Sequence, residues 1–400
     1  MNTTTSRNIL VLSLSVFILS MGQNMWFAFA PEYLRLLGAG IAVVGVFSSL
    51  QSFFEAIYNY PAGRFLDRYG LRATLVGANI LAAIGYFIYL ISPNFIVVFI
   101  GLPFVMIWPA FIVPTTIGLL AKEAAQRAGN VQLFTREIMG RLPTLLVPTL
   151  GGIIIGLLNN NVVRGVQVGL VITLIASFIT LLLQGVGYQA EPKKDSAGGK
   201  NVFEIWGEMS ADMKHMLWCE LLVKYAEVLP RALIAIYALK VLNAPPLAFG
   251  GMLALEIAVS IFARGRLNEI AIQTGYKRWL TLSFLATAIF PITILFAPHW
   301  SWLFLSFFIA GFKTAGGPVR GVVLTKLAKP QREGQHVGLY ETLIDLAVLP
   351  AGVLGGVLWQ FIGVGIPFWL ALVGGLIGCG VYYFFAPEVY PGEKNSPEML

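Results

Sequence analysis

The feature that most constrains this chain is a series of apolar runs, each about 20 residues long, that are separated by short polar or charged segments. A helix of about 20 apolar residues crosses the ~30 Å hydrocarbon core of a bilayer. The runs, each of which predicts a membrane-spanning helix, lie at 8–30, 41–62, 73–92, 95–120, 140–158, 165–187, 214–240, 246–263, 279–297, 300–323, 338–360 and 364–386. The predicted fold class is therefore an all-α membrane protein with twelve transmembrane helices.

Composition agrees with a membrane protein and argues against several other classes. Of the 400 residues, 57% are hydrophobic and 12% are charged, whereas a soluble protein carries roughly 25% charged residues. The two cysteines, Cys219 and Cys379, lie inside apolar runs and do not form a disulfide or metal-binding pattern. We find no cluster of residues at catalytic or ligand spacing, so we predict no enzyme activity, no cofactor and no metal.

The distribution of basic residues predicts an orientation in the membrane. If the N-terminus is inside, the outside holds only Arg35, Arg164 and Lys240. Four more basic residues lie within spans: Lys224, Arg231, Lys313 and Arg320. The rest of the 27 Lys and Arg residues are then cytoplasmic, as the positive-inside rule requires. This bias explains the net charge of +7 without a nucleic-acid partner and predicts two cytoplasmic termini.

The longest polar stretch divides the chain into two halves. It lies after the sixth predicted span and includes EPKKDSAGGK. We therefore predict an N-terminal six-helix half at 1–187, a cytoplasmic linker at 188–213, a C-terminal six-helix half at 214–386 and a cytoplasmic tail at 387–400.

The two halves share a sequence pattern. A loop rich in Gly and Arg follows the second predicted span of each half, so that Gly63 corresponds to Gly265 and Asp67 to Glu269, both 202 residues later. Duplicated membrane units are typical of transporters, in which two halves rock about a central site. The pattern therefore predicts a secondary transporter.

The loop of the first half, GRFLDRYGLR at 63–72, resembles the Gly-x-Leu-x-Asp-Arg-x-Gly-Arg-Arg motif of the major facilitator superfamily, with Phe65 and Leu71 as departures. The resemblance extends over nearly the whole chain. It implies two six-helix pseudo-repeats around a central cavity that is lined by helices 1, 4, 7 and 10. It also implies a role in a conformational gate for the motif residues Gly63, Asp67, Arg68, Gly70 and Arg72.

A second resemblance concerns the direction of transport. Val147-Pro148-Thr149-Leu150-Gly151-Gly152 is similar to the Gly-Pro-x-x-Gly-Gly motif of the fifth helix in bacterial drug–proton antiporters, with Val147 in place of the first Gly. The resemblance implies proton-coupled export. Many family members also carry an Arg in helix 4, but 104–119 contains none, and Lys313 in helix 10 is the nearest counterpart.

Four charged residues of the seventh predicted span form one stripe. At 100° per residue, Glu220, Lys224, Glu227 and Arg231 fall within about 60° of one another, so the stripe faces a cavity or other helices rather than lipid. Their spacing also permits pairing within the helix, and a structural role remains open. We assign proton coupling to Glu227, Lys313 and Glu220, because a mid-membrane carboxylate near a movable cation can bind and release a proton.

Other polar residues are candidates for the substrate cavity or for contacts between the halves. Amide and indole side chains near mid-membrane, together with two cations of the stripe, predict a cavity wall made of Gln23, Asn24, Trp26, Trp108, Lys224 and Arg231; ordinary helix packing is the alternative. The family resemblance implies contacts of helix 5 with 8 and of helix 2 with 11. A gate is therefore predicted from Arg141 paired with Glu256, together with Glu55 and Asp345. These two acids are like charges, so at least one of them should be protonated or should pair elsewhere, for example with Arg141 or Lys313.

The sequence thus predicts a secondary transporter that works by alternating access. The leading interpretation is proton-coupled export of a small amphipathic or hydrophobic solute by a monomer in the cytoplasmic (inner) membrane. An uptake symporter or an organic-anion exchanger is the alternative within this class. A membrane sensor or scaffold is the alternative outside it. The expected partners are a small-molecule substrate, protons and the lipid bilayer.

Overall fold

The computed structural model describes residues 3–126, 130–188, 202–329 and 333–390, and every regular element in these ranges is helical. Within them, the undescribed side chains are those of 3–6, 9, 59–61, 63, 64, 66, 67, 113–126, 130–142 and 265–273. The chain divides into two compact units. Unit 1 comprises Met1–Gly40, Leu50–Gly199 and Pro245–Ala254, and unit 2 comprises Ile41–Ser49, Lys200–Ala244 and Leu255–Leu400.

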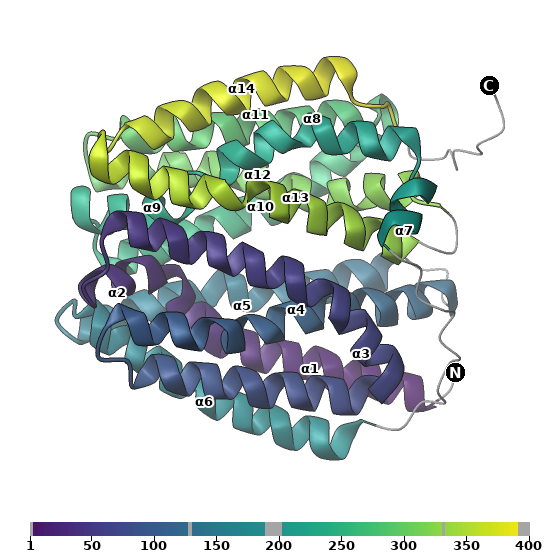
Figure 1. Ribbon diagram of the computed structural model, residues 1–400, viewed down its shortest axis with the longest axis horizontal. Helices are drawn as coiled ribbons and strands as arrows, with labels where there is room; N and C mark the ends of the chain where they lie inside the picture. The colour runs from purple at the N-terminus through teal and green to yellow at the C-terminus, as the bar shows by residue number, and fades with distance from the viewer. Residues whose placement is uncertain (1–2, 127–129, 189–201, 330–332, 391–400) are drawn as a thin grey trace. The chain divides into compact units, whose positions relative to one another are not determined.

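Unit 1 is built mainly from the first helices of the chain (Figure 1). These are α1 (Thr3–Trp26), a 3₁₀ turn (Phe27–Phe29), α2 (Ala30–Leu36), α3 (Ile41–Leu90), α4 (Phe95–Gln126), α5 (Asn130–Leu157) and α6 (Val162–Gly187). Helix α1 packs against α5 and α6.

Unit 2 is built mainly from the later helices. These are α7 (Val202–Glu208), α8 (Ala211–Val228), α9 (Arg231–Ile236), a π-helical turn (Tyr237–Val241), α10 (Pro246–Thr274), α11 (Tyr276–Leu295), a 3₁₀ turn (Trp300–Trp302), α12 (Leu303–Leu327), α13 (Glu333–Phe361) and α14 (Ile366–Phe385). Helix α11 packs against α12 and α14, and α14 packs against α8 (Figure 1). Helix α8 also contacts α13, so charged residues on α8 meet neighbours from several helices.

Glycine allows two helix segments to pack closely within each unit. The first turns of α3, Ile41–Ser49, belong to unit 2, where a Cβ on Gly45 would lie 2.4 Å from the carbonyl oxygen of Gly352. The first turns of α10 belong to unit 1, where a Cβ on Gly152 would lie 2.4 Å from the carbonyl oxygen of Pro246. Small residues permit such backbone contacts between membrane helices.

Among the described residues, ten helical segments are long and apolar enough to cross a membrane. Two of the twelve predicted spans are not among them. The span expected at 140–158 corresponds to the shorter apolar helix Pro143–Leu157 within α5. The span expected at 214–240 is divided among α8, α9 and the π turn, and it carries the charged stripe.

The motif at 63–72, predicted to be a loop, is helical except at Gly70, where the two helices within α3 meet. The helix is interrupted only at Gly70, with φ 77° and ψ 172°, a conformation that glycine adopts far more readily than other residues. Gly275, at the start of α11, has nearly the same backbone angles, φ 84° and ψ 159°. The predicted loop is therefore a sharp break between two helical segments, which belong to the separate candidate spans Ile41–Tyr58 and Arg68–Leu90. Gly70 and Gly275 occupy matching places in the Gly- and Arg-rich segments of the two halves, 63–72 and 265–278, and share one unusual conformation.

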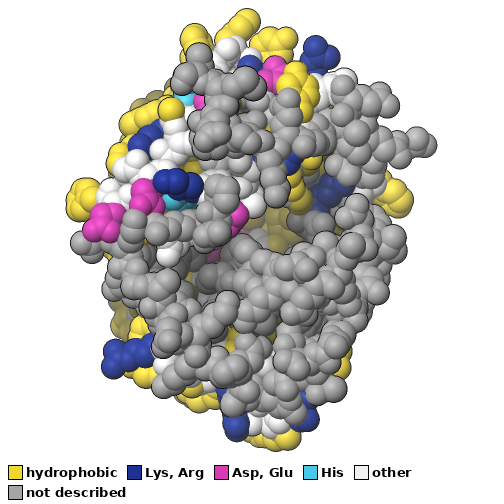
Figure 2. Space-filling view, turned by 90° about the vertical axis from the view of Figure 1, so that its right-hand side faces the viewer, with side chains coloured by type: hydrophobic (Ala, Val, Ile, Leu, Met, Phe, Trp, Pro, Cys, Tyr) yellow, Lys and Arg dark blue, Asp and Glu magenta, His cyan; other side chains and the backbone are white. Residues whose placement is uncertain are grey.

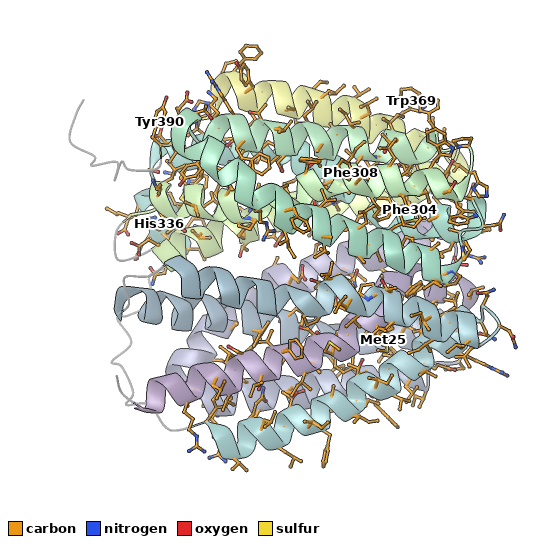
Figure 3. All side chains as sticks on the ribbon, turned by 180° about the vertical axis from the view of Figure 1, so that it is seen from behind. Met25, Phe304, Phe308, His336, Trp369 and Tyr390 are labelled. Atoms are coloured by element: carbon orange, nitrogen blue, oxygen red, sulfur yellow. The ribbon has the colours of Figure 1, made fainter. Side chains whose placement is uncertain are left out.

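Helix α6 shows how the chain meets lipid. Its polar residues Thr173, Ser177, Thr180 and Gln184 are fully buried, whereas its outer face exposes apolar side chains such as Phe178. Exposed aromatic residues also occur on α12, where Phe304 and Phe308 lie one turn apart (Figure 3). Viewed from one end of the helices, hydrophobic side chains lie along the rim (Figure 2). A helix that buries its polar side chains and exposes its apolar ones is the arrangement expected at the lipid-facing surface of a membrane protein.

Candidate functional site

A group of four charged residues forms the candidate site in unit 2. The Glu227 carboxylate on α8 lies 3.0 Å from Lys224 Nζ, 3.4 Å from Arg231 Nη2 and 3.5 Å from Lys313 Nζ. We call these residues the Glu227 cluster. The predicted stripe thus brings Lys224 and Arg231 to the carboxylate, and Lys313 joins them from α12. The cluster contains three cations and one anion.

An interruption between two helices positions Arg231. Helix α8 ends at Val228 and α9 begins at Arg231, with Leu229 and Pro230 between them. Proline lacks the N–H that an uninterrupted helix needs, which accounts for a break at this point. Glu227 therefore lies in the last turn of α8, and Arg231 lies in the first turn of α9.

Two contacts position Lys313 on α12. Ser283 Oγ on α11 donates a hydrogen bond of 2.9 Å to the Lys313 carbonyl oxygen. The ammonium group lies 5.6 Å from the centre of the Phe290 ring, which is within the range of a cation–π interaction. Helix α11 therefore holds both the backbone and the side chain of Lys313.

The Glu227 cluster borders a pocket. Its lining consists of Glu227, Pro230, Arg231, Ile234, Thr287, Phe290, Pro291 and Lys313. The Arg231 side chain is 50% exposed, whereas that of Glu227 is only 18% exposed. The pocket thus combines apolar walls with an excess of positive charge, and such a concave surface attracts anions.

A second charged group, which we call the Glu220 cluster, lies about two turns earlier on α8. Glu220 is fully buried and accepts hydrogen bonds from Arg320 Nε, at 2.8 and 3.0 Å, and from the Tyr340 hydroxyl at 2.8 Å. Arg320 also donates to Glu341, at 2.5 and 3.2 Å. Glu220 is thus paired with Arg320 and Tyr340, and its predicted share in proton coupling stays a prediction.

Sequence reasoning missed three members of the Glu220 cluster. Arg320 was recognised as a charge within a span but was given no role. Glu341 is near the start of its predicted span, where an acid is unremarkable, and Tyr340 carries no sequence signal of its own. One signal could have indicated a partner for Glu220. Burial of a carboxylate inside an apolar span is costly, so Glu220 needs a cation from another helix.

The predicted cavity residues of the first half lie in unit 1. Gln23 donates to the Tyr86 hydroxyl, and Trp26 Nε1 donates to Thr173 Oγ1 at 3.1 Å. Asn24 Nδ2 donates to the carbonyl oxygen of Ser20 on its own helix, at 2.8 Å. Trp26 and Trp108 are both buried. The structure brings Gln23 and Trp26 together around Tyr86, and their role in a substrate cavity stays a prediction.

The motif residues predicted to form a gate are only partly described. Arg68 and Arg72 are exposed, and Arg68 lies 5.3 Å from the centre of the Tyr69 ring. Gly70 provides the kink of α3. The side-chain environments of Gly63 and Asp67 lie outside the described residues.

The predicted contacts between helices 5 and 8, and between helices 2 and 11, stay predictions. Glu256 on α10 accepts a hydrogen bond of 2.5 Å from Thr314 Oγ1 on α12. Its predicted partner Arg141 has an undescribed side chain. Glu55 and Asp345 are half-buried on α3 and α13.

Comparison with known protein families assigns the chain to one of them. The model of the Major Facilitator Superfamily matches residues 12–267 and, a second time, residues 216–399. The chain belongs to this superfamily. Together with the ten apolar helices of the described residues, membership makes it a multi-pass membrane protein and a transporter.

Solved structures show the same fold at low sequence identity. An auto-inhibited peptide transporter of the POT family has a TM-score of 0.75 and 13% identity, and the alignment covers 97% of this chain and 98% of that one. The nucleoside transporter NupG has a TM-score of 0.74 and 15% identity, with 95% and 98% covered. A POT family transporter in complex with 5-aminolevulinic acid has a TM-score of 0.70 and 12% identity, with 94% of each chain covered. No curated protein matches the sequence.

Proposed function

We propose that this member of the superfamily couples the transport of a small solute to protons by alternating access, and that Glu227 is the coupling carboxylate. The observation that carries the proposal is the Glu227 cluster itself. Glu227 lies among three cations that come from three separate helices, at the edge of a pocket. Ionisable groups at membrane depth are costly and usually serve function.

The cluster offers a physical route to coupling. While Lys224, Arg231 and Lys313 lie close to it, the Glu227 carboxylate is stabilised in its ionised form. Arg231 and Lys313 belong to helices other than α8, so a rearrangement of α9 or α12 changes their distance from Glu227. A carboxylate that loses its cations in a low-dielectric site binds a proton, which links proton occupancy to conformation.

The proposal includes the predicted architecture of twelve spans in two six-helix repeats. Two observations support it: the family model matches the chain twice, and Gly70 and Gly275 share a positive φ at corresponding positions. The bias of basic residues supports cytoplasmic termini in an inner membrane. We propose that the monomer is the functional form.

Two versions of the proposal differ in solute and direction. Export of an amphipathic or hydrophobic solute is supported by the antiporter-like pattern Val147–Gly152. Transport of an organic anion, by symport or exchange, is supported by the excess of cations in the Glu227 cluster. The pocket geometry favours the second version. No observation favours a sensor or scaffold.

The experiment that tests coupling measures protons and solute together. Purified protein is reconstituted in vesicles that contain a pH-sensitive dye, and solutes are added from a panel of acids, amides, amines and nucleosides. We expect at least one solute to move protons with the wild-type protein. Glu227→Gln should still bind that solute but should move no protons, because glutamine cannot titrate.

The matched control is Glu204→Gln, at an exposed acid on α7 outside the spans, which should behave like wild type. Full proton-coupled transport by Glu227→Gln would overturn the assignment of the coupling residue. A wild-type protein that moves no solute of the panel under any pH gradient would count against proton-coupled transport.

A further inference from the structure

The following inference rests on the proposed function. We infer that the solute is an organic anion and that its negative group binds Arg231 and Lys313. A proton binds Glu227 when this anion binds. The inference assigns a ligand class to the pocket and a sign to the coupling. It follows from the charge balance, the hydrogen-bond distances and the walls of the pocket.

The charge balance comes first. With Glu227 ionised, Lys224, Arg231 and Lys313 leave the cluster with an excess of two positive charges. Unbalanced charge is costly in a partly buried site, and an anion from solution reduces that cost. The neighbouring Glu220 cluster does not supply the missing charge, since both of its carboxylates already bind Arg320.

The distances show which cations can receive the anion. Lys224 lies 3.0 Å from Glu227 and makes a hydrogen bond, whereas Arg231 and Lys313 lie at 3.4 and 3.5 Å, beyond the usual hydrogen-bond length. Arg231 and Lys313 therefore interact with Glu227 mainly through charge. Their N–H groups at the pocket can donate to an oxyanion, and the planar guanidinium suits a carboxylate, sulfonate or phosphate.

The pocket walls describe the rest of the solute. Ile234, Phe290 and Pro291 provide apolar surface beside the two cations, and Thr287 adds a hydroxyl group. The enclosed space is only about 30 Å³, so it can hold the anionic group itself while the apolar walls contact the part of the solute next to that group. A free inorganic anion would use the cations but would gain little from the apolar wall.

The sign of coupling follows from Coulomb's law. A bound anion adds a second negative charge near Glu227 and competes for its cations, so anion binding favours protonation of Glu227. By reciprocity, protonation strengthens anion binding to the same extent. The proton and the anion are therefore bound together and move in the same direction.

The other charged groups near Glu227 do not reverse this sign. Among the described side chains, the charges that contact Glu227 are Lys224 on α8, Arg231 on α9 and Lys313 on α12. Helix α11 contributes Thr287 and Phe290 to the pocket, neither of which titrates there. The Glu220 cluster has two carboxylates for one cation, and the half-buried Asp345 is an acid, so neither adds positive charge. Nearby negative charge favours a proton on Glu227, as a bound anion does.

The test uses benzenesulfonate with its neutral analogue benzenesulfonamide. A sulfonate stays ionised between about pH 5.5 and pH 8, so any pH dependence of binding belongs to the protein. Binding is measured as the rise in melting temperature of the detergent-purified full chain. We expect benzenesulfonate to stabilise more than benzenesulfonamide. Its affinity should rise as pH falls, by at most tenfold per pH unit for one linked proton.

Matched variants identify the groups. Lys313→Met should lower the sulfonate affinity about tenfold, and Lys313→Arg should restore much of it, because the charge at this position attracts the anion. Glu227→Gln should bind the sulfonate at every pH about as tightly as wild type does at low pH. Lys326→Met, at a half-buried lysine near the end of α12 that donates to the Tyr390 carbonyl oxygen away from the pocket, is the control and should leave the affinity unchanged.

The outcomes separate this inference from the proposed function. Equal stabilisation by sulfonate and sulfonamide, or by neither, would overturn the anion site. Weaker sulfonate binding at low pH would overturn the shared direction of movement. Either result leaves the vesicle assay of proton-coupled transport standing, since that assay also includes neutral and cationic solutes.

Discussion

Helix α8 carries two charged clusters of opposite character. The Glu220 cluster surrounds one cation, Arg320, with two carboxylates and a tyrosine hydroxyl, and Glu220 is fully buried. The Glu227 cluster surrounds one carboxylate with three cations and borders a pocket. The first is joined by hydrogen bonds at 2.5–3.2 Å, whereas two of the three contacts in the second are 3.4–3.5 Å.

We propose that this difference separates a structural from a functional group of charges on one helix. A buried carboxylate with short hydrogen bonds from two helices fixes the packing of α8 against α12 and α13, and it has little freedom to change partners. A cluster with loose contacts and unbalanced charge can change partners at low cost. The comparison therefore predicts that stability depends on the Glu220 cluster and that ligand and proton binding depend on the Glu227 cluster.

The largest expected effect on stability comes from Arg320→Met. The substitution leaves Glu220 buried without its cation, and breaking a buried ion pair in this way costs about 3–5 kcal/mol. A thermal-unfolding experiment in detergent measures the loss. The double variant Arg320→Met with Glu220→Met should recover much of it, because no unpaired buried charge remains. A double variant as unstable as the single one would show that the pair does not determine this stability.

A smaller effect is expected between the two clusters, at the paired glycines of α12. A Cβ on Gly316 would lie 2.0 Å from Ser283 Oγ, the atom that bonds the Lys313 carbonyl oxygen. Gly316→Ala should therefore cost about 1–3 kcal/mol through overpacking, and it should also weaken anion binding by displacing Lys313.

The adjacent glycine provides a matched control. A Cβ on Gly317 would meet nothing within 4 Å, and alanine is favoured over glycine inside a helix by roughly 0.5–1 kcal/mol. Gly317→Ala should therefore leave stability equal or improved, with unchanged anion binding. Equal losses in both variants would show that the alanine side chain harms α12 generally and that the Ser283 contact is not the cause.

The helices and the shared face of the charged residues on α8 could be predicted from the sequence, because both depend on the periodicity of residues along a helix. The spacing of Lys224, Glu227 and Arg231 correctly indicated that they share one face, and apolar length indicated the helices. The helical conformation of most of 63–72 could not be predicted, since a Gly-rich charged segment is typical of a loop. The assignment of Glu220 to Arg320 rather than to the Glu227 cluster depends on which helices pack together, and periodicity within one helix contains no such information.

The smallest expected effect comes from Lys224→Gln. Lys224 makes the shortest contact to Glu227, yet its side chain is 26% exposed and Arg231 and Lys313 still neutralise the carboxylate when it is removed. Partly exposed pairs of this kind contribute about 0–1 kcal/mol. The melting temperature should therefore change little, in contrast to Arg320→Met, and sulfonate should still bind through Arg231 and Lys313. A loss of stability equal to that of Arg320→Met would show that the Glu227 cluster is structural as well, and the distinction between the two clusters of α8 would then be wrong.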